Sequence, residues 1–188
     1  GKAMLEIRYT IHPTGELEVD YRYRANADLP LLPRIGMLWV LSPELNRIRW
    51  YGPGPNPTYS DRNFERLGIW ESTVLNDWID YSRPQENGNK VGVRWMEMTD
   101  GAGAGLRFEA LGGSPLSINA LPWPASRLRA TDYSWQLPRP DATYLNIDFA
   151  QMGVGGDNSW GATAHEGYQL SAREYAYRYR VSLLAAER

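Results

Sequence analysis

A glycine-rich stretch, residues 152–161, holds the side chains best suited to contact a ligand. It reads Met-Gly-Val-Gly-Gly-Asp-Asn-Ser-Trp-Gly, with four glycines around one large indole, that of Trp160. Glycines release the backbone from most steric limits and let another molecule approach closely. The apolar C–H face of a pyranose can stack on an indole while the sugar hydroxyls stay free for hydrogen bonds. Asp157, Asn158 and Ser159 would supply such bonds. The stretch fits a sugar platform, and it fits equally well a tryptophan packed beside a tight turn.

Histidine and cysteine, the residues that most nucleophilic triads and metal sites require, are scarce. The chain has no cysteine and only two histidines, His12 and His165, and no motif surrounds either. His165 lies five residues beyond Trp160 and is interpreted as an exposed loop residue, with a role as acid or base beside a ligand as the alternative. We therefore predict no metal site.

Glycoside hydrolysis needs two carboxylates about 5 to 9 Å apart, one of them with a raised pKa. The candidates are Glu86, Asp148 and Asp157. Each has an ordinary explanation: Glu86 lies in a turn, Asp148 on a solvent-exposed strand face, and Asp157 caps its own loop through an Asx-turn. We therefore predict no catalytic residue in this chain.

Composition excludes several classes of partner. The 188 residues carry 20 basic and 22 acidic side chains, a net charge of −2, and the basic residues are scattered, which argues against nucleic acid. No apolar run approaches the ~18 residues of a membrane helix. The first residues also lack the basic-then-apolar pattern of a signal peptide, so a cytoplasmic location is expected. No linker or repeat interrupts residues 1–188, which predicts a single domain.

The apolar residues alternate with polar ones in several segments, as in half-buried strands. Residues 17–23 are the clearest case, and the turn residues 12–15 join them to residues 5–11 as a hairpin. Residues 35–41 form a nearly continuous apolar run, which predicts a strand buried on both faces. Residues 47–51 follow as a strand, and the glycines and prolines of residues 50–62 predict a long, rigid loop.

The second half continues this pattern. Residues 64–80 show weak amphipathic spacing and predict a short helical turn. The remaining predicted strands are residues 91–96, a hairpin of 106–110 with 116–120, residues 144–149 leading into the glycine-rich stretch, and residues 175–183. Many short strands without long helices predict an all-β fold, an antiparallel sandwich.

Five segments together resemble the C-terminal domain, the small-chain region or domain 5, of β-galactosidases in glycoside hydrolase family 2. They occur in the order of that family. They are Leu32–Gly36, Trp50–Pro55 with Tyr59 and Asp61-Arg62, Pro84–Gly88, Leu145–Asp148, and Met152–Trp160. The family's small chain usually begins upstream of the position of Gly1, so its first strands are expected to be absent here.

The resemblance implies a large antiparallel β-sandwich of the galactose mutarotase-like kind, a supersandwich. It implies that residues 1–188 belong to a multidomain β-galactosidase that hydrolyses terminal β-D-galactosyl residues with retention, its catalytic glutamates lying on a separate TIM-barrel domain. The isolated chain would then be inactive. Trp160 would be an aromatic platform for the aglycone sugar, the glucose of lactose.

The same resemblance implies no cofactor in this domain, Mg²⁺ and Na⁺ on other domains, and a possible homo-oligomer. A free-standing carbohydrate-binding module using the same loop is the alternative. A mutarotase is a third candidate on grounds of fold alone, and it needs a paired histidine and carboxylate that the sequence does not display.

Overall fold

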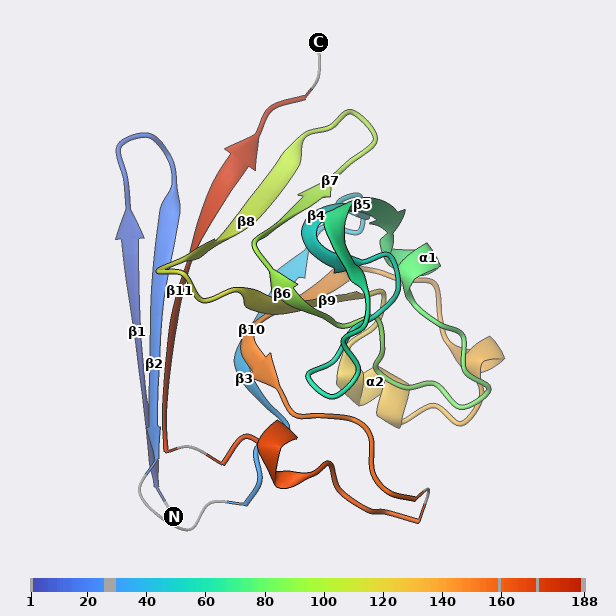
Figure 1. Ribbon diagram of the computed structural model, residues 1–188. Helices are drawn as coiled ribbons and strands as arrows, with labels where there is room; N and C mark the ends of the chain where they lie inside the picture. The colour runs from blue at the N-terminus through green and yellow to red at the C-terminus, as the bar shows by residue number, and fades with distance from the viewer. Residues whose placement is uncertain (1, 26–29, 159, 172, 187–188) are drawn as a thin grey trace.

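The computed structural model describes residues 2–25, 30–158, 160–171 and 173–186. Within these ranges two antiparallel sheets face each other, joined by loops and a few short helices (Figure 1). The strands are β1 (Ala3–Ile11), β2 (Leu17–Ala25), β3 (Arg34–Leu41), β4 (Arg47–Gly54), β5 (Arg66–Thr73), β6 (Lys90–Val93), β7 (Trp95–Thr99), β8 (Gly105–Leu111), β9 (Leu116–Leu121), β10 (Thr143–Gln151) and β11 (Glu174–Leu184). The helices are α1 (Val74–Asp77) and α2 (Ala125–Arg129), with 3₁₀ turns at Ser134–Gln136 and Glu166–Tyr168.

One sheet has the strand order β1-β2-β11-β8-β7-β4-β5, and the other has the order β3-β10-β9-β6. Every pairing within them is antiparallel, which confirms the predicted sandwich. The hairpin of β1 and β2 is confirmed, with Ile11 opposite Leu17. In β11 the apolar and charged residues alternate between the two faces as predicted.

Tyrosine and tryptophan join the two sheets through their polar ends. The Tyr177 hydroxyl on β11 donates to the carbonyl of Ile147 on β10 at 2.7 Å. The Trp39 indole N–H on β3 donates to the Tyr179 hydroxyl at 2.9 Å. Burial raises the pKa of both tyrosine hydroxyls, which stay neutral. These rings therefore fill the core and satisfy their polar atoms within it.

Strand β3 corrects the prediction of a doubly buried strand. Leu38 and Val40 are 55% and 62% exposed, while Ile35 and Leu41 on the opposite face are buried. The reason is that β3 is an edge strand of the four-stranded sheet and only its inner face meets the other sheet. The apolar run of residues 35–41 does not by itself show which face of the strand meets the core and which meets solvent.

The segments rich in glycine and proline were also partly mispredicted. Strand β4 runs on to Gly54, because its pairing with β7 ends at Tyr51 and Pro53 lies where only β5 is paired. Residues 64–80 contain the predicted short helical turn, α1, and the strand β5 that precedes it was not predicted. The Thr73 side chain caps α1 by accepting from the Asn76 N–H at 3.2 Å.

Two predicted units divide between the sheets. Residues 91–96 were predicted as one strand, but β6 belongs to the four-stranded sheet and β7 to the seven-stranded sheet. Gly92, with φ +68°, lies just before this crossing. Residues 106–110 and 116–120 are not a hairpin, because β8 pairs with β7 and β11 whereas β9 pairs with β10 and β6. Gly112 and Gly113, both with positive φ, carry the chain from one sheet to the other.

Strand β10 is buried on both faces, and this corrects the prediction that Asp148 is exposed. Leu145 and Ile147 lie in the core, and Asp148 on the outer face is 1% exposed. The segment that follows residue 84 covers this outer face: Asn146 donates to Asn119 at 2.6 Å, and Asn119 in turn donates to the Asn87 carbonyl at 2.5 Å.

Arg34 joins two carboxylates beneath this cover. Its guanidinium contacts Glu86, and its Nε lies 3.3 Å from Asp148 Oδ2. Neither carboxylate oxygen of Asp148 accepts a hydrogen bond from a described residue. Burial raises the pKa of Asp148 to about 7, against the opposing effect of Arg34, and the nearby charge of Glu86 raises it further.

The raised pKa of Asp148 predicts a pH-dependent stability. An aspartate in the unfolded chain loses its proton near pH 3.8, whereas folded Asp148 keeps it up to about pH 7. Between these values the folded state binds the extra proton, so stability falls as pH rises and stays low above pH 7. Relative to Asp148→Asn, the wild type should lose on the order of 4 kcal/mol across this interval. Urea unfolding at a series of pH values measures the difference, and a pH-independent difference would contradict the assignment.

Gly36 predicts a second stability effect. It lies opposite Asp148 in the pairing of β3 with β10, and a Cβ at Gly36 would lie 1.9 Å from Asp148 Oδ1 and 2.5 Å from the Asp148 Cα. Because a paired backbone cannot move aside, Gly36→Ala should lower the unfolding free energy by about 3 kcal/mol. Gly101→Ala, whose Cβ would meet nothing closer than 4.0 Å, is the matched control. Equal unfolding midpoints for the two variants would show that the strands separate easily.

Candidate functional site

The glycine-rich stretch of residues 152–161 begins where β10 ends and is tied down along its first half. The Met152 N–H donates to the Pro33 carbonyl at 2.9 Å, and the Gly153 N–H donates to the Tyr168 carbonyl at 2.8 Å. Further along, the Gly155 N–H donates to Asp61 Oδ2 at 2.7 Å. We call residues 152–161 the tryptophan loop. Its first half is held by three separate parts of the chain.

The tip of the tryptophan loop is closed by contacts of its own. Asn158 Oδ1 accepts from the Trp160 N–H at 2.8 Å, which forms an Asx-turn. Asp157 pairs with His165 at 2.7 Å. A Cβ at Gly156 would lie 2.3 Å from the Ala162 carbonyl oxygen, so the two arms of the loop touch at a position that only glycine fits. The turn therefore presents Trp160 on a closed tip.

The Trp160 side chain points into solvent. Its residue is 92% exposed, whereas the core tryptophan Trp50 is 1% exposed. The interpretation of Trp160 as a packed anchor is therefore wrong. An exposed indole on a hydrogen-bonded loop can stack on the apolar face of a sugar or another flat ligand without first being uncovered.

The structure describes two of the other three predicted contact residues. Asp157 and Asn158 lie on the same tip, but the Asx-turn predicted for Asp157 is made by Asn158. Ser159 lies outside the described residues. The pairing of Asp157 with His165 was not predicted, because nothing in an eight-residue separation signals that two side chains meet. Both are well exposed, with side chains 79% and 68% accessible, so the pair is not enclosed as a proton-transfer pair would be.

The three candidate carboxylates do not form a catalytic pair. Glu86 and Asp148 are brought together, but each contacts Arg34, and of the three side chains only Asp148 is fully buried. Asp157 stands apart on the loop tip with His165 as its partner. No group of three or more histidine, cysteine, aspartate or glutamate side chains that could hold a metal occurs in the part of the chain that the structure describes.

A buried ion pair elsewhere is also satisfied internally. Lys90 on β6 is fully buried and its ammonium contacts Asp77, donates to the Gly88 carbonyl at 3.0 Å, and lies 4.6 Å from the ring centroid of Trp50. Burial lowers the pKa of Lys90, whereas the charge of Asp77 opposes that change. The pair ties α1 to β6 and has no free donor facing a hollow.

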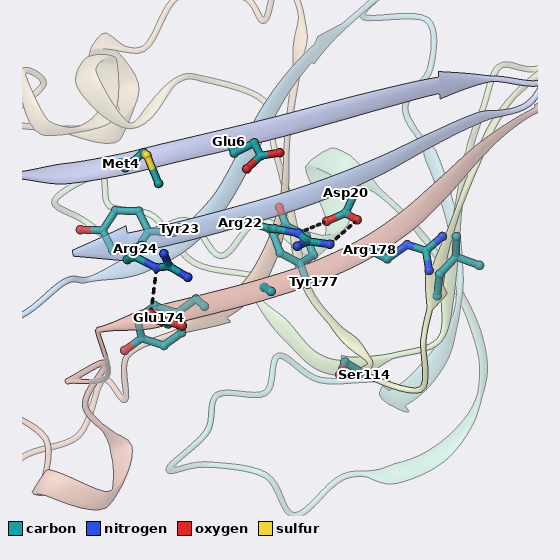
Figure 2. A pocket seen from close by; sticks show the side chains of 13 residues that line it. Met4, Glu6, Asp20, Arg22, Tyr23, Arg24, Ser114, Glu174, Tyr177 and Arg178 are labelled. Carbon is teal, nitrogen blue, oxygen red and sulfur yellow. Dashed lines mark hydrogen bonds and ion pairs between the residues drawn. The ribbon is translucent and has the colours of Figure 1, made fainter. Parts of the chain in front are cut away.

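A groove of about 460 Å³ crosses the outer face of β1, β2 and β11. Figure 2 shows two ion pairs among its charged side chains, one within β2 and one between β2 and β11. Arg24 pairs with Glu174 at 2.8 Å, and Arg22 pairs with Asp20 at 3.2 Å. No residue of the tryptophan loop lines this groove. Its charges are mutually neutralised, so it offers little to a charged ligand.

A smaller hollow of about 280 Å³ lies at the root of the tryptophan loop. It is lined by Gln151, which immediately precedes the loop, and by Ser60 and Asn63, which flank Asp61. These side chains can donate and accept hydrogen bonds, as hydroxyl-bearing ligands require. The hollow and the tryptophan loop are therefore both attached to the end of β10 and to the turn that carries Asp61.

None of the helices in the described ranges is long and apolar enough to cross a bilayer.

Comparison with known proteins gives a consistent result. The chain is 40% identical to beta-galactosidase BgaC of Bifidobacterium adolescentis over 174 residues, which is 91% of this chain and 17% of that protein. It is 34% identical to a beta-galactosidase of Priestia megaterium over 180 residues, 95% of this chain and 17% of the relative. It is 37% identical to a beta-galactosidase of Lactobacillus delbrueckii subsp. bulgaricus over 174 residues, 92% of this chain and 17% of the relative.

The chain therefore spans about a sixth of the length of these relatives. The family model for the beta galactosidase small chain matches residues 2–183, almost the entire sequence. With the sandwich and its loops in place, this match shows that the chain belongs to the β-galactosidase small-chain family.

Proposed function

We propose that this chain is the C-terminal β-sandwich domain of a β-galactosidase of glycoside hydrolase family 2. The polypeptide hydrolyses terminal β-D-galactosyl residues with retention, and Trp160 is the platform against which the leaving sugar stacks. The observation that carries the proposal is the 92% exposure of an indole on a loop held at three separate places. An apolar ring displayed in this way contributes little to folding, and the hydrogen bonds that hold its loop favour binding, because they lower the cost of ordering the loop.

The chemistry of bond cleavage belongs, in this proposal, to another domain. A retaining glycosidase needs two carboxyl groups about 5 to 5.5 Å apart on either side of the scissile bond. Within the described residues, Asp148 and Glu86 face the half-buried Arg34 and Asp157 faces His165. The catalytic glutamates would lie on a TIM-barrel domain of the same polypeptide. The sites for Mg²⁺ and Na⁺ would also lie on other domains, and the chain alone would be inactive. A cytoplasmic location and a homo-oligomer belong to the same proposal.

A free-standing carbohydrate-binding module is the alternative to this role. The lengths of the relatives count against it, since each is about six times as long as the matched segment. A mutarotase-like activity has little support, because the His165–Asp157 pair is open to solvent on both sides.

Replacing Trp160 tests the proposal in the polypeptide that carries this chain. Trp160→Ala should raise the KM for lactose about tenfold, the equivalent of about 1.4 kcal/mol, and should reduce transfer of galactose to added glucose. Inhibition by free galactose should stay unchanged, because galactose does not occupy the leaving-sugar position. Steady-state kinetics and the ratio of transfer to hydrolysis measure these effects.

Trp135 provides the matched control. It is also an exposed tryptophan, at 79%, and lies at a 3₁₀ turn stacked on Tyr133 away from the tryptophan loop. Trp135→Ala should leave the KM for lactose at the wild-type value. An unchanged KM and transfer ratio in Trp160→Ala would rule out the platform role.

A further inference from the structure

Asp61 is the one described side chain that reaches the tryptophan loop from the β4–β5 connection. Its Oδ2 accepts from the Gly155 N–H at 2.7 Å. A Cβ at Gly153 would lie 2.6 Å from the same oxygen, and a Cβ at Gly155 would lie 3.2 Å from it. The carboxylate therefore lies directly against the backbone of the loop at two glycines. The loop can approach Asp61 this closely only because those positions carry no side chain.

The backbone around Asp61 is held in a tight turn. Tyr59 and Arg62 exchange both backbone hydrogen bonds, each 3.0 Å long. The Arg62 guanidinium also lies 5.1 Å from the centroid of the Tyr59 ring, and Tyr59 is buried. This leaves Ser60 and Asp61 at the apex of a two-residue turn, so the position of the carboxylate follows from the position of the turn.

This turn is fixed to the four-stranded sheet through the residue that precedes it, Thr58. Thr58 is fully buried, its N–H donates to the Asn89 carbonyl at 2.7 Å, and its carbonyl accepts from Asn89 Nδ2 at 3.0 Å. Thr58 Oγ1 accepts from the Val91 N–H at 3.0 Å. Asn89 Oδ1 accepts from the Ser117 hydroxyl on β9 at 3.0 Å. Hydrogen bonds thus fix Thr58 to the sheet, the adjoining Tyr59–Arg62 turn carries Asp61, and Asp61 holds the loop.

We propose that Asp61 is a positioning residue that holds the Trp160 indole in the orientation that accepts the leaving sugar. This inference rests on the proposed function of Trp160. Gly155 lies five residues before Trp160, and the tie at Asp61 is the last one to a distant part of the chain before the tip. Without it the loop would remain attached through Met152 and Gly153, but its tip would sample orientations in which the indole misses the sugar. The apparent affinity falls in proportion to the fraction of loops that stay in the binding orientation.

Three variants test this in the β-galactosidase polypeptide that carries the chain. Asp61→Ala removes the acceptor and should raise the KM for lactose three- to tenfold, with inhibition by free galactose unchanged. Asp61→Asn keeps an oxygen that can accept from the Gly155 N–H and should restore most of the affinity. Gly153→Ala leaves the carboxylate intact but pushes the loop away from it, and should act in the same direction as Asp61→Ala. Asp132→Ala, at an exposed aspartate of another loop, is the control.

The double variant separates positioning from general stability. If Asp61 acts only through Trp160, then Asp61→Ala combined with Trp160→Ala should have the same KM for lactose as Trp160→Ala alone. Multiplied effects of the two substitutions would overturn the proposal, as would a wild-type KM in Asp61→Ala beside a raised KM in Trp160→Ala. In that second case the function of Trp160 stands and only the role of Asp61 fails.

Hydrogen exchange provides a readout that does not depend on sugar. The Gly155 amide should exchange at least tenfold faster in Asp61→Ala than in the wild type, while the amides of β10 keep their protection. Unchanged exchange at Gly155 would overturn the role of Asp61 even if the variant has a raised KM. If Trp160→Ala leaves lactose kinetics unaltered, the proposed function itself fails, whatever the exchange of Gly155 shows.

Discussion

Burial of β10 on both faces is the constraint from which the rest of the structure follows. On the inner face Leu145 and Ile147 pack between the sheets, and the Ile147 carbonyl accepts from the Tyr177 hydroxyl. On the outer face Asn146 and Asp148 are enclosed by the segment around Asn87 and by Arg34. A strand held on both faces has little freedom at its end, so the tryptophan loop starts from a fixed point.

This arrangement separates the groups that stabilise the fold from the group that is free to bind. Of the polar side chains that looked like candidates for chemistry, Asp148 lies on β10 and Glu86 lies in the segment that covers this strand, and both contact Arg34. The loop that leaves β10 is braced by backbone and side-chain hydrogen bonds, yet its indole makes little contact with the protein. Bracing the backbone of a loop while exposing its largest ring lowers the entropy cost of binding, because the loop need not be ordered when the ligand arrives.

The alternation of apolar and polar residues was enough to predict the fold class and most strands. It correctly placed β2, β10 and β11, because each has an inner face that the core requires to be apolar. Strand β1 is exposed along most of its length, and the turn residues that join it to β2 were the signal for it. The alternation failed where the answer depends on a distant partner. The pattern in β8 and β9 is that of a hairpin, and only the pairing partners reveal that the two strands lie in different sheets. Likewise nothing local to Asp148 shows that residues 86–89 will cover it.

Prediction of the candidate site from sequence was limited in the same way, by contacts between distant residues. The glycines and the indole of the tryptophan loop were evident from residue type and spacing. The contact between Asp61 and Gly155 joins residues 94 positions apart, and the pairing of Asp157 with His165 depends on how the loop tip closes. A signal for the former did exist, because two closely spaced glycines indicate that some other group approaches the backbone.

The most direct measurement of the central claim is a crystal structure of an inactivated form of the polypeptide that carries this chain, with lactose bound. The account predicts that the C–H face of the glucose ring lies about 4 Å from the Trp160 indole, with the galactose ring beyond it in a site formed by another domain. Lactose bound with its glucose ring against other residues, and Trp160 still facing solvent, would contradict it.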